Sequence, residues 1–90
     1  MGVKKIARPL NKAKNEFIKW LKKNKATNIE IFEGTPNTEW DYYRSVEAFI
    51  GEDLYVVYFM MWQGKINIEY RDGYNSYEKL SIDEFLDLLE

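Results

Sequence analysis

The chain has 90 residues, a net charge of −2, and neither histidine nor cysteine. Without cysteine it forms no disulfide and no thiolate metal site, and without histidine it lacks the usual general base and the commonest transition-metal ligand. A chain of this length suffices for one domain and no more. We therefore expect a single domain over residues 1–90 that is not an enzyme, with no cofactor and no metal site.

Charge is distributed unevenly along the chain. Residues 1–27 carry nine Lys or Arg against one acid, a balance of +8, whereas residues 28–90 carry four against fourteen acids, a balance of −10. Such asymmetry is compatible with a charged partner and with neutralisation inside the fold.

No targeting or membrane segment is evident in the sequence. The first ten residues lack the apolar region of a signal peptide, and no apolar stretch reaches transmembrane length. Position six is Ile6, where a myristoylation motif requires Ser or Thr. We therefore expect a cytoplasmic protein.

An amphipathic helix is predicted near the start of the chain, after a basic, loosely ordered arm over residues 1–8. Pro9 suits the first turn of a helix. Apolar residues then recur every three or four positions, which places them on one face toward a core. They are Leu10, Ala13, Phe17, Trp20 and Leu21. Lysines mark the polar side of this helix, at Lys12, Lys19, Lys22 and Lys23.

β-rich runs separated by turn residues follow this helix. They cover residues 29–33, 40–50, 54–62 and 65–71. Gly51-Glu52 and Gln63-Gly64 are typical of two-residue hairpin turns. We expect Asp72-Gly73 to end the sheet, which leaves a four-stranded antiparallel meander.

A short helix is predicted at the end of the chain. Ser81 and Glu84 have the spacing of a capping box, in which the Ser hydroxyl and the Glu carboxylate each accept a hydrogen bond from a free backbone N–H. The inward face of this helix would carry Ile82, Phe85, Leu86 and Leu89. The expected fold is α+β, with an N-terminal helix, a four-stranded antiparallel meander and a short C-terminal helix.

The two hairpin turns predict which sheet face each side chain occupies. A two-residue turn at 63–64 pairs Phe59 with Ile68, and one at 51–52 pairs Val46 with Val57. The resulting core face holds Val46, Ala48, Val57, Phe59, Ile66 and Ile68. We expect the first helix and, more weakly, the last helix to pack on it.

The opposite face mixes aromatic, aliphatic and charged side chains. Its predicted partner-binding residues are Tyr43, Glu47, Phe49, Val56, Tyr58, Met60, Trp62, Glu69 and Arg71. A strand that is apolar on both sides normally has both faces covered. Three covers are compatible with this pattern: a helix or end of the chain itself, a second copy in a structural homodimer, or a different protein. Tyr, Trp, Met and Arg are enriched at interfaces with other proteins.

In size, charge and helix–meander–helix layout, this Asn-, Lys- and Tyr-rich chain is similar to small phage or mobile-element proteins, including some anti-CRISPR inhibitors. This likeness implies a protein that blocks a host nucleic-acid-handling complex by mimicking nucleic acid. It involves no shared motif, so no functional position is transferred. Protein binding or inhibition through the mixed face and the acidic surface is the function that we expect.

Two further functions are weighed against this one. Lys12, Lys19, Lys22 and Lys23 could bind nucleic acid by contacting phosphates, although the acids of residues 28–90 would repel the same backbone. Glu47 and Glu69 near Tyr58 could serve general acid–base catalysis, although scattered acids are far more often surface charges.

Overall fold

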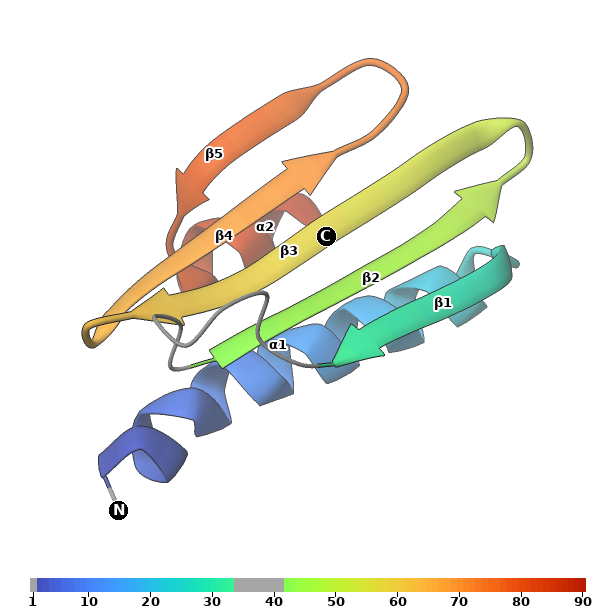
Figure 1. Ribbon diagram of the computed structural model, residues 1–90. Helices are drawn as coiled ribbons and strands as arrows, with labels where there is room; N and C mark the ends of the chain where they lie inside the picture. The colour runs from blue at the N-terminus through green and yellow to red at the C-terminus, as the bar shows by residue number, and fades with distance from the viewer. Residues whose placement is uncertain (1, 34–41) are drawn as a thin grey trace.

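The computed structural model describes residues 2–33 and 42–90, with side chains from residue 8 onward. This part of the chain forms two layers, a five-stranded antiparallel sheet and two helices that lie on one of its faces (Figure 1). The strand order β1-β2-β3-β4-β5 follows the chain, so the sheet is a meander. The predicted α+β class and element order are confirmed, but the sheet has five strands where we expect four.

In chain order, the described residues form two helices and five strands. They are α1 (Gly2–Lys23), β1 (Thr27–Glu33), β2 (Tyr42–Ile50), β3 (Asp53–Trp62), β4 (Lys65–Arg71), β5 (Ser76–Leu80) and α2 (Ile82–Leu88). The expected start of the second strand at residue 40 lies outside the described residues. The capping box of α2 is present, with the Glu84 N–H donating to Ser81 Oγ over 3.1 Å and the Ser81 N–H donating to Glu84 Oε1 over 2.9 Å.

The fifth strand is the main difference from the expected sheet. Asp72 opens a turn, because its Oδ1 accepts hydrogen bonds from the backbone N–H groups of Tyr74 and Asn75 over 2.8 and 2.7 Å. This turn leads the chain back along β4 as β5, in which only Leu80 is buried. The prediction that Asp72-Gly73 ends the sheet is therefore wrong. The strand was not recognised in the sequence because an exposed strand carries no alternation of apolar residues.

The first helix is longer than its sequence pattern indicates. It begins at Gly2, so residues 2–8 have a helical backbone where we expect a loosely ordered arm. Pro9 lies inside the helix instead of in its first turn. The apolar period that predicts the helix begins only at Leu10, which is the first of its residues to enter the core.

The end of α1 has the geometry of a Schellman motif. Lys25 has a φ of 61°, and its N–H donates to the Lys22 carbonyl over 3.1 Å. The N–H of Ala26 donates to the Leu21 carbonyl over 2.9 Å. These bonds satisfy carbonyls left free at the helix end and turn the chain toward β1.

Both helices of the described chain pack on the predicted core face. Three phenylalanines join the layers, with ring-centroid distances of 6.4 Å for Phe17–Phe59, 5.8 Å for Phe17–Phe85 and 5.3 Å for Phe59–Phe85. These rings come from α1, β3 and α2, so both helices contact the same strand. Five of the predicted core residues of the sheet are buried, and the sixth, Ile66, is half-buried against them. The five are Val46, Ala48, Val57, Phe59 and Ile68.

The two turns beside β3 have the predicted lengths. Ile50 pairs with Asp53 across Gly51-Glu52, and Trp62 pairs with Lys65 across Gln63-Gly64. Gly51 has the positive φ of 64° that a type II′ turn requires at its first central position. Gln63 and Gly64 both have positive φ, of 50° and 75°, as in a type I′ turn. The predicted pairing of Phe59 with Ile68 and of Val46 with Val57 follows.

The two edge strands are irregular. The β1–β2 register shifts between Thr27 and Glu30, where Asn28 has a φ of 53°. The β4–β5 register shifts between Ile68 and Tyr70, and Lys79 of β5 has a φ of 57°. Each edge therefore contains a local break in its ladder.

Replacement of Lys25 by glycine should stabilise the protein. Glycine adopts a positive φ without the steric cost of a Cβ, so we expect Lys25→Gly to raise the free energy of unfolding by about 0.5–1 kcal/mol. The matched control Lys12→Gly places glycine inside α1 and should lower it by about 1 kcal/mol. Urea denaturation of the three proteins measures both changes, and a lower stability of Lys25→Gly would contradict this account of the helix end.

The Asp72 carboxylate should make the free energy of unfolding depend on pH. Burial raises the pKa of its carboxyl, but hydrogen bonds from the Tyr74 and Asn75 N–H groups and from the Tyr70 hydroxyl outweigh burial, so the net pKa is lowered. This stabilisation is complete above the unfolded pKa of about 3.9 and is lost as the pH falls through the lower folded value. Urea denaturation between about pH 5 and 2 should therefore show a steeper loss for the parent than for Asp72→Asn; equal slopes would exclude this role.

Candidate functional site

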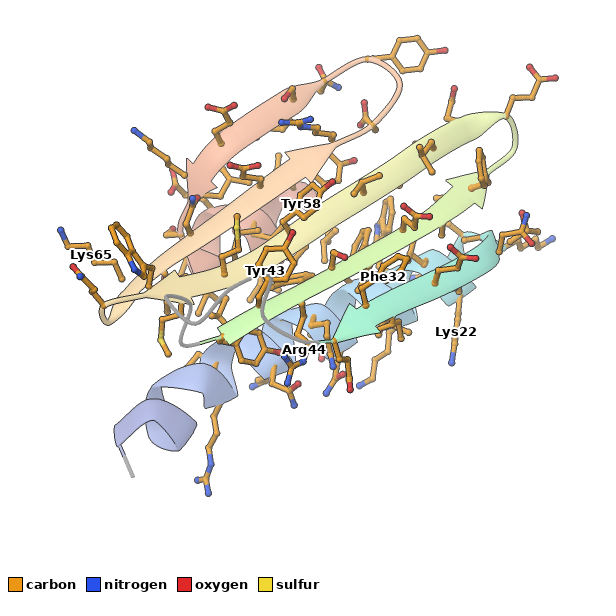
Figure 2. The ribbon with its side chains drawn as sticks, viewed as in Figure 1. Lys22, Phe32, Tyr43, Arg44, Tyr58 and Lys65 are labelled. Carbon is orange, nitrogen blue, oxygen red and sulfur yellow. The ribbon has the colours of Figure 1, made fainter. Side chains whose placement is uncertain are left out.

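The sheet face that turns away from α1 and α2 is the candidate site, and we call it the open face. Figure 2 shows Tyr43 and Tyr58 projecting from the side of the sheet opposite to α1. Among the described residues that the strand register places on this face are Glu30, Phe32, Tyr43, Ser45, Glu47, Phe49, Leu54, Val56, Tyr58, Met60, Trp62, Lys65, Asn67, Glu69 and Arg71. All of the predicted partner-binding residues are among them.

Large apolar side chains on the open face remain accessible. Phe32 is 55% exposed, Trp62 45%, Leu54 41% and Phe49 37%. In the described part of the chain no helix covers them, so the alternative that α1 or α2 packs on this face does not hold (Figure 1). Such side chains mark a surface that can bury apolar area against a partner.

The middle of the open face is more closely packed. Met60 is only 6% exposed and Ser45 8%, and the Tyr43 and Tyr58 rings lie 6.4 Å apart at an angle of 52°. Burial raises the pKa of the Tyr43 hydroxyl, and the nearby Tyr58 and Glu69 raise it further. Tyr43 therefore stays neutral at physiological pH and presents a hydroxyl on an aromatic ring.

Two carboxyl groups face one another on one side of the open face. Glu30 of β1 is paired directly with Glu47 of β2. Partial burial raises the pKa of Glu47, and the hydrogen bond and the charge of Glu30 raise it further. Like charges directly opposite in a sheet are destabilising, so this pair is a negative centre that a cationic group would relieve.

The other side of the open face, on β4, carries the cationic groups. Arg71 Nη2 lies 3.9 Å from Glu69 Oε2, and Lys65 is paired with Trp62 next to the turn. Between them lies Asn67, whose Oδ1 is buried and accepts no hydrogen bond from the described residues. Negative charge therefore concentrates on β1 and β2, and positive charge on β4.

The carboxylates proposed for catalysis are only partly brought together. Glu69 pairs with Tyr58, as the register predicts, but Glu47 pairs with Val56 and belongs to the next row of the sheet. Strand β3 separates the two acids. Among residues 2–33 and 42–90 no group of three or more acidic side chains is arranged to hold a metal ion.

The lysines proposed for nucleic-acid binding lie on the helix layer. Lys12, Lys19 and Lys23 line a groove of about 420 Å³ between α1 and the C-terminal end of the chain. The rest of the groove consists of Glu16, Trp20, Leu86, Leu89 and Glu90. Lys22 is not part of this lining, and Figure 2 shows its side chain pointing away from the sheet. Since Lys19 Nζ lies 3.6 Å from Glu16 Oε1, the groove has mixed charge.

Sequence reasoning missed Glu30 and Phe32 as members of the open face. Eight residues separate β1 from β2 in the sequence, and the shift near Asn28 changes the register, so alternation alone does not assign their faces. The available signal for membership of the open face was the apolar Phe32 near acidic residues. An apolar residue in this position is equally compatible with the core face and with the open face.

Comparison of the sequence with protein-family models, with curated proteins and with solved structures gives no match. Within the described residues neither helix has the length and apolar character needed to cross a membrane. The function is therefore inferred from the geometry of this chain alone.

Removal of one of the facing carboxylates should stabilise the sheet. We expect Glu30→Gln to raise the free energy of unfolding by a few tenths of a kcal/mol at neutral pH. The folded-state pKa of Glu47 is raised, so ionisation of Glu47 lowers the stability of the fold at pH values above this pKa. Below the unfolded pKa of about 4.3 this destabilisation is absent, and the stability gained by Glu30→Gln should vanish there. Urea denaturation at both pH values tests this, with Glu52→Gln in the β2–β3 turn as control; an equal gain in the control would point to net charge instead.

Proposed function

We propose that this protein is a non-catalytic protein-binding domain that docks a protein partner on its open face. The observation that supports this best is that β3 is apolar on both sides while both described helices lie on one side. The uncovered side presents Val56, Tyr58, Met60 and Trp62 in succession along the strand. Aromatic and aliphatic groups of this kind form the centres of protein interfaces.

The surroundings of this row also have the composition of an interface. Glu47 lies on one flank, and Glu69 and Arg71 lie on the other. Charged residues around an apolar centre provide specificity and steer association more than they add affinity. The open face thus combines a centre that can be buried with a rim that can select its partner.

The groove on the helix layer supports nucleic-acid binding less well. Two of its lining residues, Glu16 and Glu90, are acids, and one lysine is already paired with Glu16. Phosphate binding depends on neutralising several phosphates with unpaired cationic groups. Catalysis is also less well supported, because Glu47 and Glu69 lie in different rows of the open face with β3 between them.

A finer form of the proposal is an inhibitor that acts in the cytoplasm on a nucleic-acid-handling protein. It is supported by the balance of −10 over residues 28–90 and by the acids Glu30, Glu47 and Glu69 on the open face. A surface of this charge is complementary to a basic nucleic-acid-binding groove. Displacement of a labelled oligonucleotide from the captured partner would distinguish inhibition from simple binding.

Truncation of one central aromatic residue should remove partner binding. We expect Tyr58→Ala, and independently Trp62→Ala, to lose at least tenfold in the yield of a partner captured from native host lysate, since interface centres carry most of the binding energy. The matched control is Tyr74→Ala in the β4–β5 turn, where an 84% exposed tyrosine lies outside the open face. Quantitative mass spectrometry of the captured proteins provides the measurement.

Circular dichroism and thermal unfolding establish that each variant is folded before capture is compared. A protein captured by the parent and by Tyr74→Ala, but not by Tyr58→Ala or Trp62→Ala, supports the proposal. Equal capture by all four proteins would place the interface elsewhere.

A further inference from the structure

On the open face, polar groups of complementary chemistry lie on opposite sides of β3. Glu47 of β2 and Arg71 of β4 are both paired with Val56, so acid and base lie in one row on opposite sides of the central strand. Two rows further along β3 on the same face, Tyr43 and Asn67 are both paired with Met60. Each row thus contains an apolar residue on β3 between two polar groups of complementary chemistry.

We propose that the partner that fits this face is a second copy of the chain, packed face to face about a two-fold axis parallel to β3. This inference rests on the proposed function, because it names the partner for the same face. Rotation about this axis exchanges β2 with β4 and leaves each residue at its own height along the strands. Glu47 then faces the partner's Arg71, and Arg71 faces the partner's Glu47.

The remaining rows also match under this rotation. Tyr43 then lies opposite the partner's Asn67, and Ser45 lies opposite the partner's Glu69, so no like charges meet in either row. Val56 and Tyr58 face their own copies along the axis and form the apolar centre, beside the largely buried Met60. The carboxylate pair of Glu30 and Glu47 gains the cationic neighbour that it lacks among the described residues of a single chain.

The distances of ordinary sheet packing suit these contacts. Packed sheets lie about 10 Å apart, a gap that a glutamate and an arginine side chain together can bridge. The usual rotation of about 30° between aligned sheets turns about the centre of the face at Tyr58, from which Glu47 and Arg71 lie about 8 Å, so it displaces these facing residues by about 4 Å. Long side chains accommodate a displacement of that size.

The alternative two-fold axis, running across the strands through the same central row, is disfavoured. It would leave each strand opposite its own copy and bring Glu69 against the partner's Glu69 at the centre of the contact. Like charges brought together in an interface cost several kcal/mol. Charge complementarity therefore selects the axis along β3.

The size of the open face is adequate for a stable dimer. With five strands and a central strand of ten residues, the face is about 20 Å wide and about 30 Å long at normal strand spacings. Its projected area of about 600 Å² is of the order of the roughly 800 Å² of accessible surface that each partner buries in a standard interface. Accessible surface exceeds projected area because side chains protrude from the sheet.

A charge exchange tests the predicted pairing. Light scattering on the parent should give a mass near twice the 10.8 kDa of one chain. Glu47→Arg alone and Arg71→Glu alone each place like charges opposite one another at both symmetric contacts, and should weaken dimerisation at least tenfold. An equimolar mixture of these two variants should form the heterodimer, because each of its contacts again joins an acid to an arginine. The double variant Glu47→Arg/Arg71→Glu should also dimerise.

Circular dichroism shows that the variants are folded, and Glu52→Arg in the β2–β3 turn is the control that should leave the dimer unchanged. Restoration of the dimer in the mixture supports the inference. A monomeric parent, a dimer that persists in both single variants, or folded single variants whose mixture stays monomeric would each overturn it. Capture of a different protein that is lost with Tyr58→Ala, together with a monomeric parent, would overturn the dimer and retain the proposed function.

Discussion

The two-residue turns at the ends of β3 set the organisation of the whole molecule. They fix the partners of each residue in β3, and side-chain alternation then assigns every residue of the three central strands to one face. A one-residue slip would expose Val57 and Phe59 and bury Tyr58, at a cost of about 1.5–3 kcal/mol for each apolar side chain removed from the core. The helices reinforce this choice of register, because Phe17 of α1 and Phe85 of α2 pack on Phe59, which lies on the core face. The composition of the open face is therefore a direct consequence of the hairpin register.

The opposite charges of the two chain segments are neutralised only in part. Lys14, with its side chain 10% exposed, lies 3.8 Å from Glu33, and Arg44 lies 4.0 Å from the same carboxylate, which ties α1 to the first two strands. Neutralisation inside the fold thus accounts for part of the charge asymmetry. The lysines of the groove lie on the helix layer, whereas the facing acids Glu30 and Glu47 lie on the open face. A partner that approaches the open face meets acids and aromatic rings, and the basic helix is on the far side of the sheet.

Sequence patterns predict this fold well wherever a single physical cause dominates. Alternation in β3 and the capping box of α2 each depend on neighbours within a few residues, and both are confirmed. The pattern fails for β5, which is held by pairing with β4 and by the Asp72 turn, not by burial. It also fails for Glu30 and Phe32, because the register of β1 depends on a bulge that no short motif marks. The groove beside α1 could not be predicted, since it exists only through the position of α2.

The breaks in the two edge strands restrict the ways in which this molecule can associate. An unbroken edge offers a row of free N–H and C=O groups to which another strand can add, and the process can repeat without limit. The positive φ of Asn28 in β1 and of Lys79 in β5 interrupts both rows, and Lys79 adds an exposed charge to one of them. Growth into open-ended fibres is thereby hindered at each side of the sheet. On the proposed open-face interface, by contrast, one partner occupies the whole surface, which would favour closed complexes of defined size.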